Sequence, residues 1–136
     1  MKKNKAKTDL ILIRFPILYY LQLPSGMGYA HNILKKCSIN FTTYDLNEKF
    51  YNFYLKDIDN IDTEISKNIL NRFLSDFSAE IVKKKTKIIA ISIDSVEYFL
   101  KESLDIFISN LKQKYPEIIF IAGGQSCFHH NLVSYI

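Results

Sequence analysis

The sequence contains no tryptophan and only four glycines, three prolines and two cysteines among its 136 residues. Cys37 and Cys127 lie far apart, and neither has a second cysteine at metal-ligand spacing. We therefore expect two buried or half-buried free thiols in a cytoplasmic protein, with a disulfide as the alternative. No apolar run approaches the ~20 residues that a membrane span needs. The sequence also has neither a GxGxxG motif nor a P-loop, which disfavours nicotinamide and nucleotide-triphosphate binding.

The formal net charge is +4, and part of it lies in the lysine-rich residues Met1 to Lys7. A tail of this kind can contact a phosphate backbone or an anionic membrane, but a solvated, disordered terminus is the better interpretation. We therefore predict a disordered basic tail over residues 1–8 and one domain over residues 9–136, with neither nucleic acid nor membrane as a partner.

Short apolar runs occur three times and set the frame of the fold. They are Leu10 to Phe15, Lys87 to Ile93, and Ile118 to Ala122, the last of which is followed by Gly123-Gly124. Runs that are rich in branched residues and do not alternate between apolar and polar residues predict strands that are buried on both faces. The segment Ile39 to Leu46 alternates more and carries polar residues, which favours a strand at or near the sheet edge.

Amphipathic segments separate these runs. A helix is predicted to begin near Gly26, with Met27, Ala30, Leu34 and Cys37 on one face. A short helix is expected over residues 47–55 with an aromatic face of Phe50, Phe53 and Tyr54. Longer helices are predicted over residues 61–81 and 96–111 from apolar residues that recur every three to four positions. Strands alternating with helices indicate βαβ units and therefore an α/β fold with a parallel sheet.

In an open parallel sheet, ligands bind beyond the carboxyl ends of the strands. The loops predicted to meet there are residues 16–26, Asp94-Ser95 and Gly123 to Cys127, which offer small residues, hydroxyls and backbone amides. This composition favours holding a large ligand over acid–base chemistry. The alternative for Gly123-Gly124 is a simple tight turn. We expect Gly124→Val to separate the two interpretations, because it should abolish ligand binding without loss of helix if the pair provides backbone approach.

Weaker candidates each have a simpler structural explanation. His129-His130 can ligate a metal, but adjacent residues point apart. Asp94 can bind a cation, yet with Glu97 it resembles a helix capping box. Cys127 lacks an identified base, and His31 on the first helix suits a surface or half-buried position.

Four short motifs follow one another along the chain: Pro24-x-Gly26-x-Gly28-Tyr29, Tyr44-Asp45-Leu46-Asn47, Ile91-Ser92-Ile93-Asp94 and Ile121-Ala122-Gly123-Gly124. Their order resembles that of the cobalamin-binding domains that precede radical S-adenosylmethionine enzymes. The resemblance spans roughly Leu10 to Gln125. The resemblance implies a flavodoxin-like sheet with strand order 2-1-3-4 that stops before a fifth strand.

The resemblance also implies a site and a cofactor. Cobalamin would contact residues at the carboxyl edge of the sheet, which are Ser25, Gly26, Ser92, Asp94, Ser95, Gly123 and Gly124. The Asp-x-His-x-x-Gly signature of some cobalamin domains is absent, so no axial histidine and no metal ligand is assigned. The Cys-x-x-x-Cys-x-x-Cys motif is also absent. By this resemblance the chain binds neither an iron–sulfur cluster nor S-adenosylmethionine, is not catalytic on its own, and has a radical S-adenosylmethionine catalytic domain or chain as its partner.

Two other functions fit the same residues. The first is a degenerate domain that no longer binds cobalamin and acts as an interaction module through its open sheet edge. The second is a flavodoxin-like domain that binds a different phosphate-bearing ligand.

Overall fold

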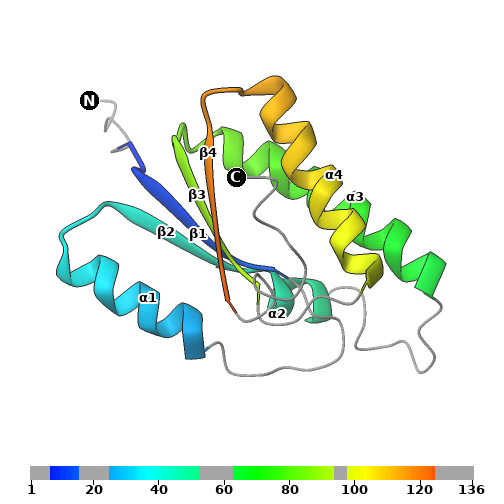
Figure 1. The fold of residues 1–136 in the computed structure, drawn as a ribbon, viewed down its shortest axis with the longest axis horizontal. Helices are drawn as coiled ribbons and strands as arrows, with labels where there is room; N and C mark the ends of the chain where they lie inside the picture. Colours follow the sequence, from blue (N-terminus) through cyan, green and yellow to red (C-terminus); the bar gives the residue numbers. More distant parts are fainter. Residues whose placement is uncertain (1–6, 16–24, 53–62, 94–97, 125–136) are drawn as a thin grey trace.

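The computed structural model describes residues 7–15, 25–52, 63–93 and 98–124, which form a parallel β-sheet covered by helices (Figure 1). The strands are β1 (Leu10–Arg14), β2 (Phe41–Asp45), β3 (Ile88–Ser92) and β4 (Ile119–Gly123). They pair in parallel in the order β2-β1-β3-β4. This confirms the predicted α/β, flavodoxin-like arrangement and places β2 at an edge.

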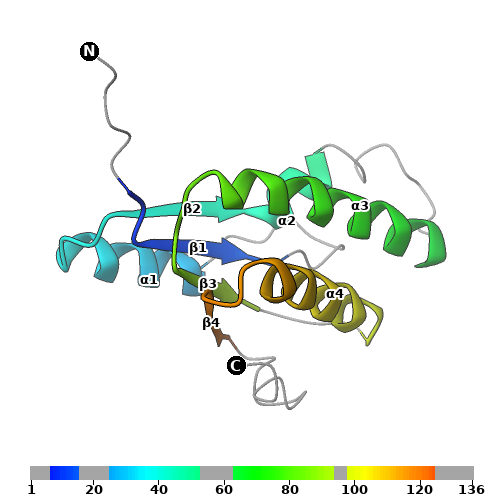
Figure 2. The same cartoon turned by 90° about the horizontal axis from the view of Figure 1, so that it is seen from above.

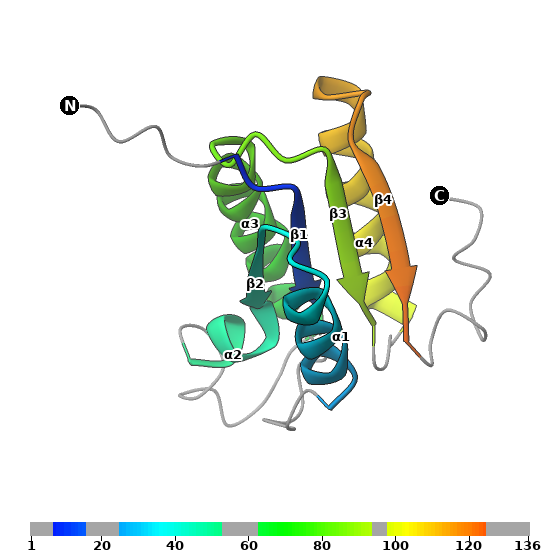
Figure 3. The ribbon, with the colours of Figure 1, turned by 90° about the vertical axis from the view of Figure 1, so that its left-hand side faces the viewer.

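Four helices connect or flank these strands: α1 (Ser25–Lys36), α2 (Leu46–Phe50), α3 (Thr63–Val82) and α4 (Tyr98–Lys114). Figure 3 looks onto one face of the sheet, with α1 in front of the strands and α3 and α4 behind them. Seen from above, α3 runs along the β2 side and α4 along the β3 side (Figure 2). Right-handed crossovers place the helices in this way, because the chain moves from β1 outward to β2 and then back across to β3.

The core lies between the sheet and the pair of helices α3 and α4. Ile11, Ile13, Ile89, Ile91 and Phe120 project from the sheet toward these helices and are buried. The helices contribute the predicted apolar stripes, whose buried members are Leu70, Leu74, Phe77, Ile81, Leu104, Phe107, Ile108 and Leu111. The central strand β1 is buried on both faces, as its apolar run predicts.

Two local predictions need correction, and a third is only partly covered by the described residues. The apolar run predicts that β4 is buried on both faces, but Ile119 is 55% exposed and Ile121 is 49% exposed, because α1 covers β1 on that side of the sheet. Cys37 lies beyond the end of α1 and is exposed, so it does not belong to the buried helix face. Of the short helix expected over residues 47–55, the structure describes α2, in which Phe50 is buried, while Phe53 and Tyr54 lie outside the described residues and their part stays a prediction.

Helices within the described ranges are either too short or too polar to cross a lipid bilayer.

Tyr44 provides a pH-dependent contribution to stability. Burial, together with the charge of Glu80 and a hydrogen bond to it, raises the pKa of the Tyr44 phenol above its ordinary value of 10.0. The folded state therefore holds this proton more tightly than the unfolded state, so its contribution is complete below pH 10 and is lost as the pH rises through the higher folded pKa. When the pH is raised from about 9 to about 11, we expect the free energy of unfolding, measured in urea, to fall less for Tyr44→Phe than for the parent.

Glu80→Gln should reduce this alkaline loss only in part, because burial is the largest cause of the shift. An equal alkaline loss in the parent and in Tyr44→Phe would contradict the assignment.

Candidate functional site

One row of residues crosses the sheet where the strands end. Arg14 pairs in register with Asp45 on one side and Ser92 on the other, and Ser92 pairs with Gly123. Side chains alternate between the faces of a strand, so these positions share the face opposite the Ile13 and Ile91 core. The structure therefore brings together Ser92 and Gly123, two of the residues predicted from the sequence, in adjacent strands.

The row is held in place by backbone hydrogen bonds from the residues that directly follow β1 and β3. The Phe15 amide donates to the Ser92 carbonyl oxygen at 3.0 Å, and the Ile93 amide donates to the Gly123 carbonyl oxygen at 2.8 Å. Ser92 itself is half-buried and Gly123 is exposed. The backbone positions at this edge are thus set by the sheet.

Ser25 and Gly26 form the first turn of α1, the helix that follows the loop leaving the carboxyl end of β1. The first turn has no acidic residue, so its backbone N–H groups and the positive end of the helix dipole are not neutralised by a neighbouring carboxylate on the helix. Gly26 is exposed and has no neighbouring atom within 4 Å of the place where a Cβ would be.

The two glycines of the pair have different physical roles. Gly124 has φ +112°, and a Cβ there would collide with the carbonyl oxygen of Ile93 and lie 2.8 Å from its carbonyl carbon. Gly124 is therefore required by the close approach of two backbones. At Gly123 a Cβ would meet nothing within 4 Å, so the absence of a side chain leaves open space at the edge. The tight-turn interpretation applies to Gly124, whose φ requires glycine, and the ligand interpretation remains open for Gly123.

This difference corrects the expectation attached to Gly124→Val. A branched side chain at residue 124 would clash with the backbone of Ile93, the residue that follows β3, so a loss of ligand binding in that variant would report a local structural change. Gly123 is the position at which an added side chain tests ligand approach.

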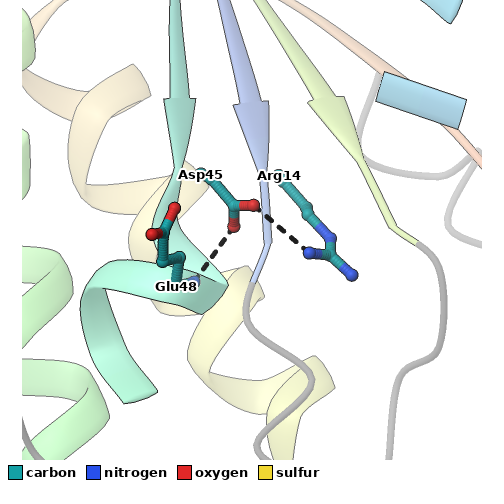
Figure 4. Close-up of polar contacts among 3 residues, drawn as sticks. All are labelled: Arg14, Asp45 and Glu48. Carbon is teal, nitrogen blue, oxygen red and sulfur yellow. Dashed lines mark hydrogen bonds and ion pairs between the residues drawn. The ribbon is translucent and has the colours of Figure 1, made fainter. Parts of the chain in front are cut away.

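The ionisable residues of the row are Arg14 and Asp45, which sequence reasoning did not assign to the site. The Arg14 side chain is almost fully buried, and its Nη1 lies 3.2 Å from Oδ2 of Asp45. The other carboxylate oxygen of Asp45 accepts a hydrogen bond from the Glu48 amide at 3.0 Å and so caps α2 (Figure 4). The sequence does contain a signal for this pair: an arginine ends an apolar strand, and an aspartate ends the neighbouring strand.

The other sequence candidates are either outside the described residues or placed on the surface of a helix. Asp94, Ser95, Cys127 and His129-His130 lie outside the described residues. His31 is exposed, and its Nδ1 lies 3.0 Å from the Thr43 hydroxyl, as its predicted surface position allows. In the described part of the chain, no three residues of the histidine, cysteine, aspartate and glutamate types are grouped so that they could hold a metal ion.

The arrangement suits binding better than proton transfer. It offers a hydroxyl at Ser92, an uncovered backbone at Gly123 and a helix N-terminus at Gly26, while Arg14 and Asp45 are paired with each other. Comparison of the chain with protein-family models, curated proteins and solved structures finds no match.

The two glycines should respond differently to alanine. We expect Gly124→Ala to destabilise the fold by about 2 kcal/mol or more, because the left-handed backbone disfavours a Cβ and the added atom meets the Ile93 carbonyl. Gly123→Ala should be neutral or slightly stabilising, since alanine restricts the unfolded chain and meets open space. Urea unfolding of both variants measures this, and equal losses would refute the distinction.

Removing the charge of Asp45 should be costly even though the cap is kept. The asparagine side chain in Asp45→Asn can still cap α2, but it no longer places a negative charge beside the buried Arg14 guanidinium. We expect a loss of about 3 kcal/mol, the lower end for a broken buried pair, because Asp45 is partly exposed.

The control is the double variant Arg14→Met with Asp45→Asn, which should recover most of this loss because no uncompensated charge remains. Denaturant unfolding of all three chains measures the free energies. A double variant that is as unstable as Asp45→Asn would show that the charge pair is not the cause.

Proposed function

We propose that this chain is a cobalamin-binding-type domain, the N-terminal part of a cobalamin-dependent radical S-adenosylmethionine enzyme, and that it acts in the cytoplasm. The observation that carries the proposal is the open position of Gly123 beside Ser92 at the carboxyl edge of a parallel sheet with order β2-β1-β3-β4. This is the edge at which open α/β sheets bind ligands.

The residues at this edge fit the nucleotide tail of a corrinoid. The tail is long and mostly uncharged, and it needs close backbone approach, which a residue without a side chain at position 123 permits. The half-buried Ser92 hydroxyl supplies a donor and an acceptor next to that backbone. The first turn of α1 at Ser25 and Gly26 has N–H groups suited to the single phosphate of the tail.

Within this proposal the chain binds and orients the cofactor. Cobalamin, if bound, would supply a cobalt centre, and Ser25, Gly26, Ser92 and Gly123 would hold its nucleotide tail. The iron–sulfur cluster and S-adenosylmethionine would be held by a separate catalytic domain or chain, which is the proposed partner, because the cysteine motif that holds the cluster is absent from this sequence.

Titration of the purified chain with hydroxocobalamin, followed by absorbance and gel filtration, tests the proposal. We expect a spectrally shifted corrinoid that co-elutes with the folded protein. Gly123→Val should weaken binding at least tenfold, because the added side chain occupies the space through which the ligand approaches the backbone.

The matched control is Gly28→Val. Gly28 is also exposed, and a Cβ there also meets nothing within 4 Å, but it lies within α1 and outside the row. Circular dichroism should be the same for the parent and both variants, and Gly28→Val should bind as the parent does.

A folded parent chain that does not bind hydroxocobalamin would contradict the proposal. If the same chain were protected against heat by flavin or nucleotide, the alternative of another phosphate-bearing ligand at this edge would take its place. Equal affinity of Gly123→Val and the parent would remove Gly123 from the site.

A further inference from the structure

β4 ends the sheet in the described part of the chain, since it pairs with β3 on one side and with no described strand on the other. Its exposed residues are also apolar: Ile119 and Ile121 project from the face that carries α1, and both are about half exposed. Edge strands usually carry charges, prolines or bulges that prevent pairing with another chain. The five residues of β4 contain no charge and no proline.

The opposite edge of the sheet is different. β2 carries Thr42, Thr43 and Asp45, and its last residue is engaged by Arg14 and by the start of α2. The β4 edge is therefore the one that lacks polar protection among the described strands.

The direction of the backbone groups along β4 follows from its pairing with β3. The Ile119 amide donates to the Lys87 carbonyl oxygen, and the Gly123 carbonyl oxygen accepts from the Ile93 amide, each at 2.8 Å. In a parallel pair, alternate residues face the partner strand. The N–H and C=O groups of Phe120 and Ala122 consequently face away from β3.

These outward groups match those of a second, antiparallel copy of β4. With a two-fold axis at Ile121, Phe120 of one copy lies opposite Ala122 of the other, and the two residues can exchange both of their backbone hydrogen bonds. The side chains fit as well, because the large Phe120 meets the small Ala122 and Ile119 meets Gly123. Ile121 lies opposite its own copy as a close, non-hydrogen-bonded pair.

We propose that two copies of this chain associate through antiparallel pairing of β4 and so join the described strands of both copies into one continuous sheet. The inference goes beyond the proposed ligand and does not depend on it, since the carboxyl edges of the two copies point in opposite directions along the paired strands. Pairing of two five-residue strands buries little area, so we expect a dimer whose population depends on concentration.

Sedimentation velocity over a range of protein concentrations tests the dimer. The parent should shift from monomer to dimer as the concentration rises. Ile121→Lys should prevent this shift by placing two like charges opposite each other. Ala122→Pro should also prevent it, because the amide that it removes faces away from β3, on the side of β4 where no described strand pairs.

Two matched controls separate this edge from other surfaces. Ile106→Lys introduces the same charge at an isoleucine of α4 that is 40% exposed, and Ile33→Lys does so on α1, where the residue is 47% exposed. Both variants should dimerise as the parent does. A monomeric parent at all concentrations, a dimer that survives Ala122→Pro, or a dimer lost in Ile33→Lys would each overturn the proposal.

Disulfide formation gives an independent measure of the register. In a background with Cys37→Ser and Cys127→Ser, Ile121→Cys should form a covalent dimer under mild oxidation, because Cα atoms of such a pair are ~4.5 Å apart. Ile119→Cys is the control, since four residues separate it from its copy along the paired strands, about 13 Å. Crosslinking of Ile119→Cys with none of Ile121→Cys would overturn the proposed register.

Discussion

A buried guanidinium at the end of the central strand constrains the whole carboxyl edge of the sheet. Arg14 closes β1 between β2 and β3, and its charge is met by Asp45, which also begins α2. A buried charge is tolerated only with such a partner, so the ends of β1 and β2 and the start of α2 are positioned together. The same interaction leaves the ionisable groups of the row engaged with each other, and this is why the edge is suited to binding.

Much of the architecture could be predicted from the pattern of apolar residues. The run at Leu10 to Arg14 is a central strand buried on both faces, and the stripe that contains Leu70, Leu74 and Ile81 is a long helix against the sheet. β4 shows why the prediction was incomplete. An apolar run indicates a tendency to be buried, but whether Ile119 and Ile121 are covered depends on where other elements lie, and the sequence of the strand does not contain that information.

The site could be predicted only in part, because its details also depend on where other elements lie. The sequence indicated that Ser92 lies near the end of one strand and that Gly123-Gly124 follow another, and strand register brings Ser92 and Gly123 side by side. It did not distinguish the two glycines, because the difference comes from the backbone of Ile93, which lies far away along the chain and directly against Gly124. Arg14 was overlooked because its role depends on the register between β1 and β2. The ligand is proposed from the resemblance to cobalamin-binding domains, and the geometry defines the edge at which its binding is tested.

The most direct measurement of the central claim is a map of backbone amide resonances in the ¹⁵N-labelled chain during addition of hydroxocobalamin. We expect the largest changes at Gly26, Ser92 and Gly123, at the carboxyl edge, while residues at the start of the strands, such as Ile88 and Ile119, should change little. Changes centred on the starts of the strands or on α3, or no changes at all in a folded chain, would contradict this claim.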